Sequence, residues 1–351
     1  MKILINALSG IGDALMFSPA LKILHDNLPN YKIDMLVMFH SVKELYRTSP
    51  YLNNIYHIDF LKQSSVKSLK EIYDLRKNDY FMSVNVYPSN RYEYNILNYL
   101  IGAKKRYGHT YCNPKFPSLS FLNNFTIEEE KDIHNVVQNL NLVKMICDFN
   151  IDDAGNLEIF LNEDDENAAK LWMKDKCIES NKFIVGFHAG SSTLKNHIHK
   201  RWDVRKYAAL GNRLIEEKNA KILLFGSEFE LNKELNKLMN GRGVIASTNN
   251  YMDSMARLKQ CNLFVSNDTA FLHSASAFGI PVAAIFGYTN HKELYPWMTK
   301  HVIIRKELEC SPCFFNSPRP ARCKWKGADE FKCVRTIELE EVYTACMNLL
   351  N

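Results

Sequence analysis

Long apolar segments are absent from this 351-residue sequence. No apolar run reaches the roughly 20 residues that a membrane-spanning helix needs. The apolar start of the chain, residues 1–7, is shorter than the hydrophobic region of a secretory signal, and no small-residue cleavage site follows it. We therefore expect a cytoplasmic protein.

A strong excess of charge of either sign is also absent. The 44 Lys and Arg residues against 39 Asp and Glu residues give a net charge of +5. This mild charge does not demand a nucleic-acid partner, and we expect none. It suits an anionic small molecule or a membrane surface that carries acidic lipids.

Internal repeats and low-complexity tracts are missing too, and short apolar strands alternate with helical segments. This alternation is typical of an α/β fold whose parallel sheets are covered by helices. The polar stretch 150–163 separates two such halves, and the acidic run 163–166 is explained most simply as a solvated helix start. We predict two Rossmann-like domains, residues 1–165 and 166–335, whose sheets face a cleft with ligands at the strands' carboxyl ends.

A complete dinucleotide-binding glycine motif is lacking. Residues 10–13, Gly-Ile-Gly-Asp, follow the first predicted strand, but Leu15 stands three residues after Gly12. Glycines here let the backbone approach a ligand, so Gly12 is a candidate ligand-binding residue. Asp13 starts a predicted helix over residues 14–28 and is either an N-cap or a general base for an acceptor hydroxyl. The incomplete motif weakens a third interpretation, a dinucleotide-dependent oxidoreductase.

The sequence is most informative at residues 266–273, Ser-Asn-Asp-Thr-Ala-Phe-Leu-His, which follow a short apolar strand. Asp268 or Thr269 can cap the next helix, whose free first-turn amides and dipole can hold an anion such as a phosphate. His273 falls about one turn later, within reach of the same place. An ordinary capped helix with no ligand is the alternative.

Two further strand ends carry polar residues. Ser191 and Ser192 follow the predicted strand 183–187, and Lys200 comes soon after, where it can neutralise a diphosphate. A basic surface loop is the alternative. Glu230 follows the predicted strand 221–225, where a carboxylate can accept ribose hydroxyls or simply stabilise a helix start.

In combination, these motifs resemble those of the bacterial ADP-heptose heptosyltransferases, inverting glycosyltransferases of the GT-B fold. The family's Gly-x-Gly-Asp matches residues 10–13, its His-x-Gly-x-Ser matches 188–192, and its Lys-Arg-Trp matches 200–202. Its Gly-x-x-x-Glu matches residues 226–230, and its Asp-Thr-Gly-x-x-His matches 268–273. Several linked motifs in the same order are more specific than any one of them.

The resemblance implies how a donor diphosphate is bound. Ser191, Ser192 and Lys200 would hold it, while Thr269 and His273 would lie around its phosphates. No catalytic metal or other catalytic cofactor would be needed, because the leaving charge develops in a positive, amide-lined pocket.

The resemblance also implies the remaining roles. Asp13 would deprotonate the acceptor, Glu230 would hold the ribose, and Met252 would line the adenine pocket. Asp268 would bind the sugar hydroxyls, and the Ala270 amide would face the phosphates. Ala270 replaces the family's usual glycine, which would alter donor geometry if the position needs a positive φ or a very close phosphate.

Two other segments, a loop and the C-terminal helix, also carry predictions. The insertion 193–199 lengthens the loop before Lys200, so the position of that lysine is open. The C-terminal helix, residues 336–351, would cross back to the first domain, as in other GT-B enzymes.

Four of the nine cysteines cluster in residues 310–333, where the spacing is Cys-x2-Cys-x9-Cys-x9-Cys. Cys310, Cys313, Cys323 and Cys333 suit a structural tetrahedral site for zinc or iron. Disulfides, disfavoured in a reducing cytosol, and free thiols are the alternatives.

The sequence thus predicts a glycosyltransferase that moves heptose from ADP-heptose to a saccharide acceptor of lipopolysaccharide core or a related glycan. A lipid-linked acceptor would bring the protein to the inner membrane as a peripheral protein. The alternatives are transfer to a protein acceptor and a nucleotide-sugar-binding protein without turnover.

Overall fold

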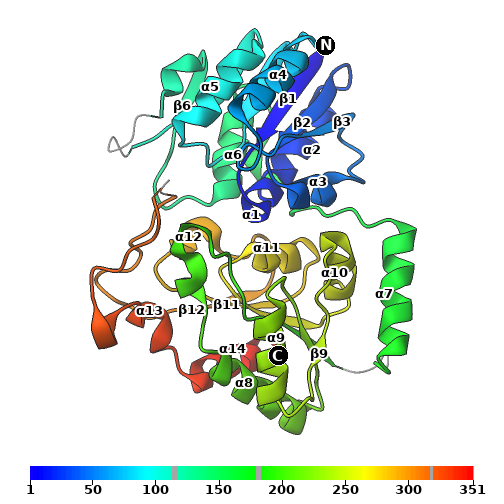
Figure 1. Cartoon of the computed structure of the whole chain (residues 1–351), viewed down its shortest axis with the longest axis vertical. Coiled ribbons are helices and arrows are strands. Elements are labelled where there is room, and N and C mark those ends of the chain that lie inside the picture. The colour runs from blue at the N-terminus through cyan, green and yellow to red at the C-terminus, as the bar shows by residue number, and fades with distance from the viewer. Residues whose placement is uncertain (113–117, 179–182, 317–318, 351) are drawn as a thin grey trace. The chain divides into compact units, whose positions relative to one another are not determined.

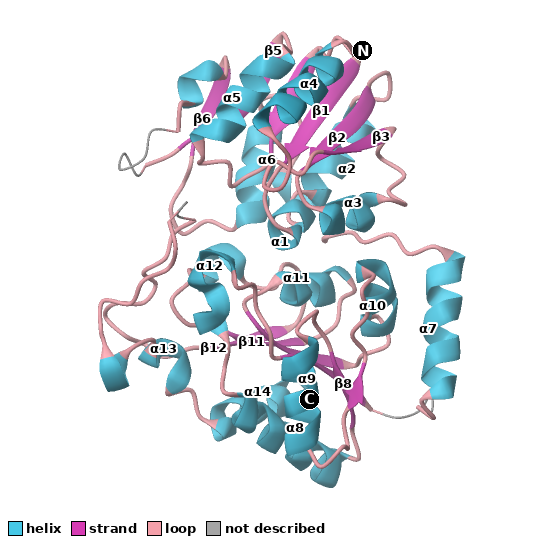
Figure 2. Ribbon diagram, viewed as in Figure 1, coloured by secondary structure: helices cyan, strands magenta, loops and turns pink. Residues whose placement is uncertain are grey.

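The computed structural model describes residues 1–112, 118–178, 183–316 and 319–350. It divides into two compact units, Met1–Phe160 and Leu161–Asn351. Each unit is built on a six-stranded parallel sheet flanked by helices (Figures 1 and 2). The predicted α/β architecture of two Rossmann-like domains is therefore confirmed. The predicted limit at residues 165 and 166 lies slightly beyond this division, inside a helix.

The sheet of the first unit has the strand order β3-β2-β1-β4-β5-β6. Helices α4 and α5 pack against each other, as do α2 and α6. The elements are β1 (Lys2–Ala7), α1 (Ile11–Leu15), α2 (Ser18–Asn27), β2 (Lys32–Val37), α3 (His40–Tyr46), β3 (Asn54–His57), α4 (Ser65–Arg76), β4 (Met82–Asn85), α5 (Tyr92–Ile101), β5 (Lys105–Thr110), η1 (Ser120–Leu122), β6 (Phe125–Glu128), α6 (Asn135–Lys144) and η2 (Ile151–Asp153).

The single helix predicted over residues 14–28 is wrong, because the chain forms two helices there. Helix α1 ends at Leu15, and α2 begins at Ser18 with Pro19 in its first turn. Proline has no backbone N–H and is tolerated at the start of a helix but not in its interior. The break keeps α1 short, with Asp13 in its only full turn.

Five buried asparagine side chains form a closed hydrogen-bonded ring at the ends of β1 and β4. The amide of Asn6 donates to Asn85 (3.0 Å) and Asn98 (2.9 Å), and that of Asn85 donates to Asn95 (2.9 Å). Asn98 donates to Asn123 (2.8 Å), which donates to Asn95 (2.8 Å) and closes the ring. A buried polar network of this kind stabilises one arrangement only while its members are paired.

Replacing Asn98 by leucine should therefore destabilise the first unit. The substitution removes two side-chain hydrogen bonds and leaves partner atoms of Asn6 and Asn123 buried without them. Each unsatisfied group costs about 1–3 kcal/mol, so the free energy of unfolding should fall by several kcal/mol. Chemical denaturation measures this, with Asn167→Leu on an exposed helix position as the control. A similar small change in both variants would contradict the role of the ring.

The sheet of the second unit has the order β12-β11-β10-β7-β8-β9. Helices α8, α9 and α14 form one packed group, and α7 packs on α10. The elements are α7 (Glu163–Asp175), β7 (Ile184–His188), η3 (Leu194–Lys200), α8 (Val204–Lys218), β8 (Lys221–Leu224), α9 (Phe229–Leu238), β9 (Val244–Ile245), α10 (Tyr251–Leu258), β10 (Leu263–Asn267), α11 (Ala270–Ala277), β11 (Val282–Ile285), α12 (His291–Leu294), β12 (His301–Ile304), η4 (Gly327–Asp329), α13 (Lys332–Arg335) and α14 (Leu339–Leu350).

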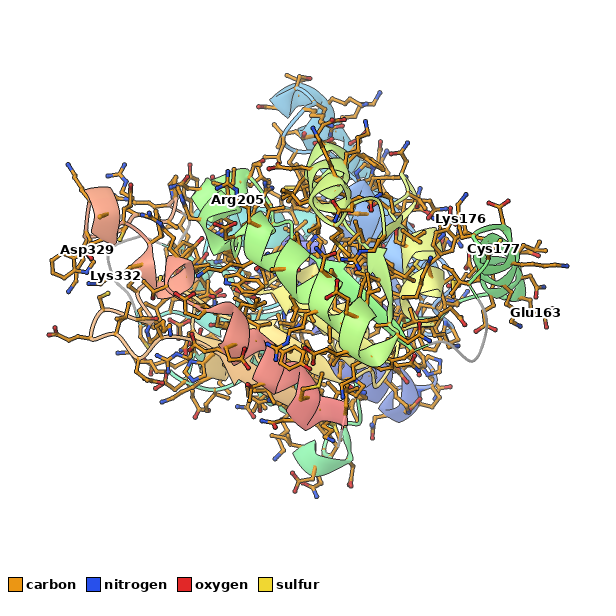
Figure 3. The ribbon with its side chains drawn as sticks, turned by 90° about the horizontal axis from the view of Figure 1, so that it is seen from below. Glu163, Lys176, Cys177, Arg205, Asp329 and Lys332 are labelled. Atoms are coloured by element: carbon orange, nitrogen blue, oxygen red, sulfur yellow. The ribbon has the colours of Figure 1, made fainter. Side chains whose placement is uncertain are left out.

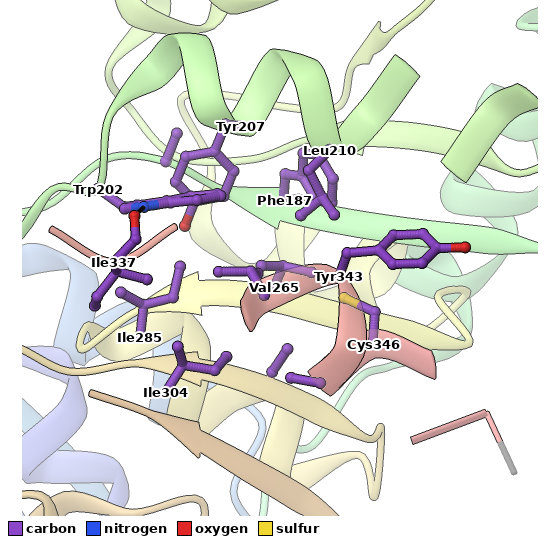
Figure 4. Packing of buried hydrophobic residues seen from close by; sticks show 14 of the residues in the cluster. Phe187, Trp202, Tyr207, Leu210, Val265, Ile285, Ile304, Ile337, Tyr343 and Cys346 are labelled. Atoms are coloured by element: carbon purple, nitrogen blue, oxygen red, sulfur yellow. Dashed lines mark hydrogen bonds between the residues drawn. The ribbon is translucent and has the colours of Figure 1, made fainter. Parts of the chain in front are cut away.

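The core of the second unit joins its sheet to its last helix (Figure 4). The buried Trp202 ring packs edge-on against Tyr207, and its indole N–H donates to the carbonyl of Ile337 (2.9 Å). Helix α14 adds Tyr343 and Cys346 to this cluster and packs on α8 and on strands β10, β11 and β12. The predicted return of this helix to the first domain stays a prediction.

The acidic run 163–166 forms the start of α7, as predicted. The side chain of Asn162 accepts from the amide of Asp165 (2.8 Å), whose carboxylate accepts from the amide of Asn162 (3.2 Å). This capping box satisfies two helix-start amides, and the acids also suit the helix dipole. Figure 3 labels Glu163, the first residue of this helix, and Lys176, its C-cap residue. None of the helices in the described ranges is both long and apolar enough to cross a membrane.

Candidate active site

The carboxyl ends of β7 and β10 lie side by side, because Ser266 pairs with His188 in the parallel register. The next residue, Asn267, is fully buried. Its side-chain amide donates to the carbonyls of Ala189 and Gly190 (both 3.0 Å). Its side-chain oxygen accepts from the amide of Trp202 (3.1 Å). Asn267 therefore fixes the loop after β7. Its role was not predicted, although an asparagine that ends a buried apolar strand is a usable signal.

Helix α11 begins without a side-chain cap. Thr269 is the N-cap residue, but its hydroxyl makes no capping hydrogen bond. The hydroxyl lies 2.8 Å from Nδ1 of His188 and 3.3 Å from the hydroxyl of Ser266. An ordinary threonine cap is therefore excluded, and the first-turn amides are not occupied by it. Such amides, with the helix dipole, suit a phosphate oxygen.

Lys200 and Asp268 form a buried ion pair beside this helix start. The Lys200 ammonium lies 2.6 Å from Oδ2 of Asp268, and the two side chains are only 16% and 5% exposed. Burial alone would raise the pKa of Asp268, but the charge of Lys200 and its hydrogen bond hold that pKa below its ordinary value. The loop 193–199, left open by the sequence, folds largely as η3 and brings Lys200 to this place.

His273 is a further titratable group close to this ion pair. Burial, against the opposing effect of Asp268 and with a smaller contribution from the nearby Lys200, lowers the pKa of its imidazole to about 4. The ring is therefore neutral at pH 7. Its Nδ1 is buried and has no hydrogen-bond partner among the described residues. A buried ring nitrogen without a partner is costly, which favours a ligand group as its partner.

Arg201 holds the loop that contains Ser191. Its guanidinium donates to the carbonyl (2.8 Å) and the hydroxyl (3.2 Å) of Ser191, and it lies 3.6 Å from Oε1 of Glu228. The other carboxylate oxygen of Glu228 lies 3.7 Å from Nε2 of His188. Burial would raise the pKa of Glu228, but His188 and then Arg201 hold it below its ordinary value.

Gly190 and Gly226 leave space for the side chains of Glu228 and His188. A Cβ at Gly190 would lie 2.4 Å from Cδ of Glu228, and one at Gly226 would lie 2.6 Å from the ring of His188. Gly226 also has φ +106°, which side chains rarely adopt. Larger residues at either position would displace Glu228 or His188.

The remaining predicted donor-site residues differ in exposure. Glu230 lies in the first turn of α9 with its carboxylate 86% exposed and 2.7 Å from Lys233. Ser192 is exposed, whereas Met252 in α10 is fully buried. Ala270 starts α11 and is not among the positive-φ residues of the described chain, so its backbone does not require glycine.

Asp13 and Gly12 lie in α1 of the first unit. The N-cap of α1 is Gly10, so Asp13 is not the cap that one interpretation made it. The loop before α1 is fixed by the hydroxyl of Ser9, which donates to the carbonyl of Pro88 (2.9 Å), and by the phenol of Tyr94, which donates to the carbonyl of Leu8 (3.3 Å).

Comparisons with known proteins identify the family of the chain. Residues 74–321 match the family described as glycosyltransferase family 9 (heptosyltransferase). The chain belongs to this family. The predicted family and the glycosyltransferase class are thereby confirmed.

Individual relatives of this family 9 member cover its full length. It is 23% identical to lipooligosaccharide heptosyltransferase 2 of Campylobacter jejuni over 100% of this chain and 98% of the relative. The structure of Escherichia coli ADP-heptose LPS heptosyltransferase II gives a TM-score of 0.75 at 18% identity, covering 100% and 98% of the two chains. The iron-containing dodecameric glycosyltransferase TibC of enterotoxigenic E. coli gives 0.59 at 12% identity, covering 99% and 76%. These structures share the GT-B fold.

The four clustered cysteines of this family 9 enzyme are free thiols near one another. Burial, together with the neighbouring Cys313, Cys323 and Cys310, raises the pKa of Cys333 to about 12. Four thiols suit zinc or iron in kind. Within the described ranges, however, no three His, Cys, Asp or Glu side chains are arranged as a metal site. Metal binding at this cluster stays a prediction.

Proposed function

We propose that this family 9 glycosyltransferase transfers a heptose from ADP-heptose to a saccharide acceptor of lipopolysaccharide core or a related glycan. Family membership supports heptosyl transfer. The relatives' names supply the acceptor class, lipooligosaccharide, and the donor, ADP-heptose. The observation that carries the proposal is the uncapped start of α11 beside Lys200 and the partnerless nitrogen of His273.

The donor diphosphate is bound at the start of α11. The Ala270 amide and the helix dipole face its oxygens, with Ser191, Ser192 and Thr269 nearby. Lys200 supplies the positive charge, and the neutral His273 supplies a ring nitrogen rather than a second charge. This arrangement stabilises the negative charge that develops on the departing ADP.

The sugar and the nucleoside are bound by residues around this centre. Asp268 accepts from sugar hydroxyls while Lys200 holds one of its oxygens. Glu230 accepts from the ribose, Met252 lines the adenine pocket, and Gly12 lets the backbone approach the donor.

The reaction is a single displacement with inversion. The acceptor hydroxyl oxygen forms a bond to the anomeric carbon, and the bond from that carbon to the ADP oxygen breaks with its electron pair on ADP. Asp13 takes the hydroxyl proton. No catalytic metal takes part in this scheme. The acceptor is lipid-linked, so the enzyme works as a peripheral protein on the cytoplasmic side of the inner membrane.

Thermal stabilisation by ADP, ADP-heptose, UDP, GDP and NAD at matched concentrations tests the donor. A ligand at about 100 times its Kd adds roughly 2.7 kcal/mol to the free energy of unfolding. Selective stabilisation by ADP and ADP-heptose is expected, and NAD alone would overturn the proposal. Turnover assays with a delipidated core oligosaccharide and with a protein acceptor then separate the two acceptor classes. No turnover with either would favour a nucleotide-sugar-binding protein.

Glu228 and Glu230 provide a matched pair. Glu228 contacts His188 and Arg201 in the ligand-free protein, whereas the side chain of Glu230 is exposed. Glu230→Gln should weaken ADP binding roughly 10- to 100-fold, the value of a charge-assisted hydrogen bond, with no change in melting temperature. Glu228→Gln should lower the melting temperature, since it weakens the contacts with His188 and Arg201. Calorimetric titration with ADP and thermal melting measure the two effects. Unchanged ADP affinity in Glu230→Gln would remove that residue from the donor site.

Elemental analysis of the purified protein tests the cysteine cluster. We expect about one zinc or iron atom per chain, bound by Cys310, Cys313, Cys323 and Cys333. Serine at Cys310 and Cys313 should remove the metal, whereas serine at the separate exposed Cys177 should not. A wild-type protein without stoichiometric metal would contradict the prediction.

A further inference from the structure

Helix α4 has an outward face that its own packing does not use. Its buried residues, Ser68, Ile72 and Leu75, lie on one side of the helix. Val66, Leu69 and Tyr73 are 79%, 54% and 63% exposed. Their spacing of three and four residues places them together on another side of the helix.

Large apolar side chains are also exposed on the elements next to α4. Leu61, just before the helix, is 61% exposed. Helix α5, which packs beside α4 (Figure 1), exposes Tyr99 by 52%, and the adjoining η1 exposes Phe121 by 77%. The clustering of large apolar side chains, rather than the exposure of any one, marks an interaction surface.

Basic residues are interspersed with these apolar ones. Residues 61–77 contain five basic side chains, Lys62, Lys67, Lys70, Arg76 and Lys77, against the acids Glu71 and Asp74. Three net positive charges of the chain's total of +5 therefore lie on this short segment. The Lys77 ammonium lies 5.2 Å from the ring centre of Tyr73, so charge and apolar surface are in direct contact.

The charge of this face distinguishes between two binding partners, a second copy of the chain and a lipid bilayer. A second copy docked symmetrically through the same face would set lysines against lysines. A bilayer with acidic lipids offers negative charge to the lysines and an acyl boundary to the apolar side chains. Tyrosine also suits the headgroup level, where its ring is buried and its hydroxyl stays hydrated.

We propose that the outer face of α4, with Leu61, docks the protein on an anionic lipid bilayer. Val66, Leu69 and Tyr73 enter the headgroup boundary, while Lys62, Lys67 and Lys70 face the acidic headgroups. The proposal deepens the proposed function, because it names the surface by which the enzyme would reach a lipid-linked acceptor.

Vesicle co-sedimentation of the full chain tests the surface. Wild-type protein should bind vesicles that contain phosphatidylglycerol and bind pure phosphatidylcholine vesicles at least tenfold more weakly. Lys67→Gln with Lys70→Gln should weaken binding to the anionic vesicles about 25-fold, since each lysine near such a surface contributes about a fivefold factor. Val66→Gln with Leu69→Gln should weaken it by a similar order.

Matched controls separate this surface from general effects. Leu171→Gln removes a 68% exposed leucine from α7, and Lys174→Gln removes a lysine from the same helix. Neither should change vesicle binding. All variants should keep the wild-type melting temperature and the wild-type turnover with a delipidated, water-soluble acceptor. That turnover reports on the proposed function independently of the membrane.

The outcomes are distinct. Loss of anionic-vesicle binding in both α4 variants alone supports the proposal. No vesicle binding by the wild type, equal loss in the α7 controls, or equal binding to neutral vesicles would overturn it. A wild-type dimer in sedimentation that the α4 variants convert to monomer, without any vesicle effect, would overturn it in favour of a contact between copies.

Discussion

Asp13→Asn should reduce heptosyl transfer by about 10²- to 10⁴-fold, the usual contribution of a positioned general base. The amide has nearly the size of the carboxylate but cannot take the acceptor proton. Gly10 rather than Asp13 is the N-cap of α1, so the substitution removes no helix cap. Stabilisation by ADP should also be unchanged, since the proposed phosphate-binding residues all belong to the second unit. Steady-state kinetics with ADP-heptose and a saccharide acceptor measures the loss.

A matched control lies in the same unit. Glu93 occupies the first turn of α5, as Asp13 occupies that of α1, and pairs with Arg91 at 2.9 Å. Glu93→Gln should leave turnover within about twofold, because a half-exposed ion pair contributes little. Wild-type turnover in Asp13→Asn would assign the base to another residue.

The sequence predicted best those features that depend on neighbours in the chain. The strand–helix–strand unit around α11 follows from an apolar run, a polar turn and a glycine end, and all three act over a few residues. The fold class follows from the same local alternation. Strands β5 and β6 were not predicted, because their sequences, Lys-Arg-Tyr-Gly-His-Thr and Phe-Thr-Ile-Glu, lack an apolar run.

The structure added features that depend on distant parts of the chain. Glu228 and Glu230 are two residues apart and chemically alike, yet only Glu228 points into the cluster, because Gly190 and Gly226 leave space there. No local pattern distinguishes the two carboxylates. Likewise, the asparagine ring joins Asn6 to Asn123 across most of the first unit, and the ion pair of Lys200 joins residues 68 positions apart.

That ion pair supports the second large prediction. Lys200→Met should lower the free energy of unfolding of the ligand-free protein by about 3–5 kcal/mol, because it leaves the carboxylate of Asp268 buried without its partner. The exposed pair of Lys233 and Glu230 is the control, since Lys233→Met should cost less than about 1 kcal/mol. Denaturation with urea at pH 7 measures both. Equal small effects would mean that Asp268 is solvated or otherwise compensated.

The pH dependence of the free energy of unfolding tests the same ion pair independently. The pKa of Asp268 is lower in the folded protein than its ordinary value, so its contribution to stability is present above pH ~4 and is lost as the pH falls through the folded-state value. Asp268→Asn should remove this part of the acid destabilisation.

The double substitution Lys200→Met with Asp268→Leu should recover much of the stability lost in Lys200→Met, since no buried charge remains. It should not recover ADP binding, because the charge that opposes the diphosphate is gone. Recovery of both would show that the pair serves the fold alone, whereas recovery of stability without binding assigns Lys200 to the donor.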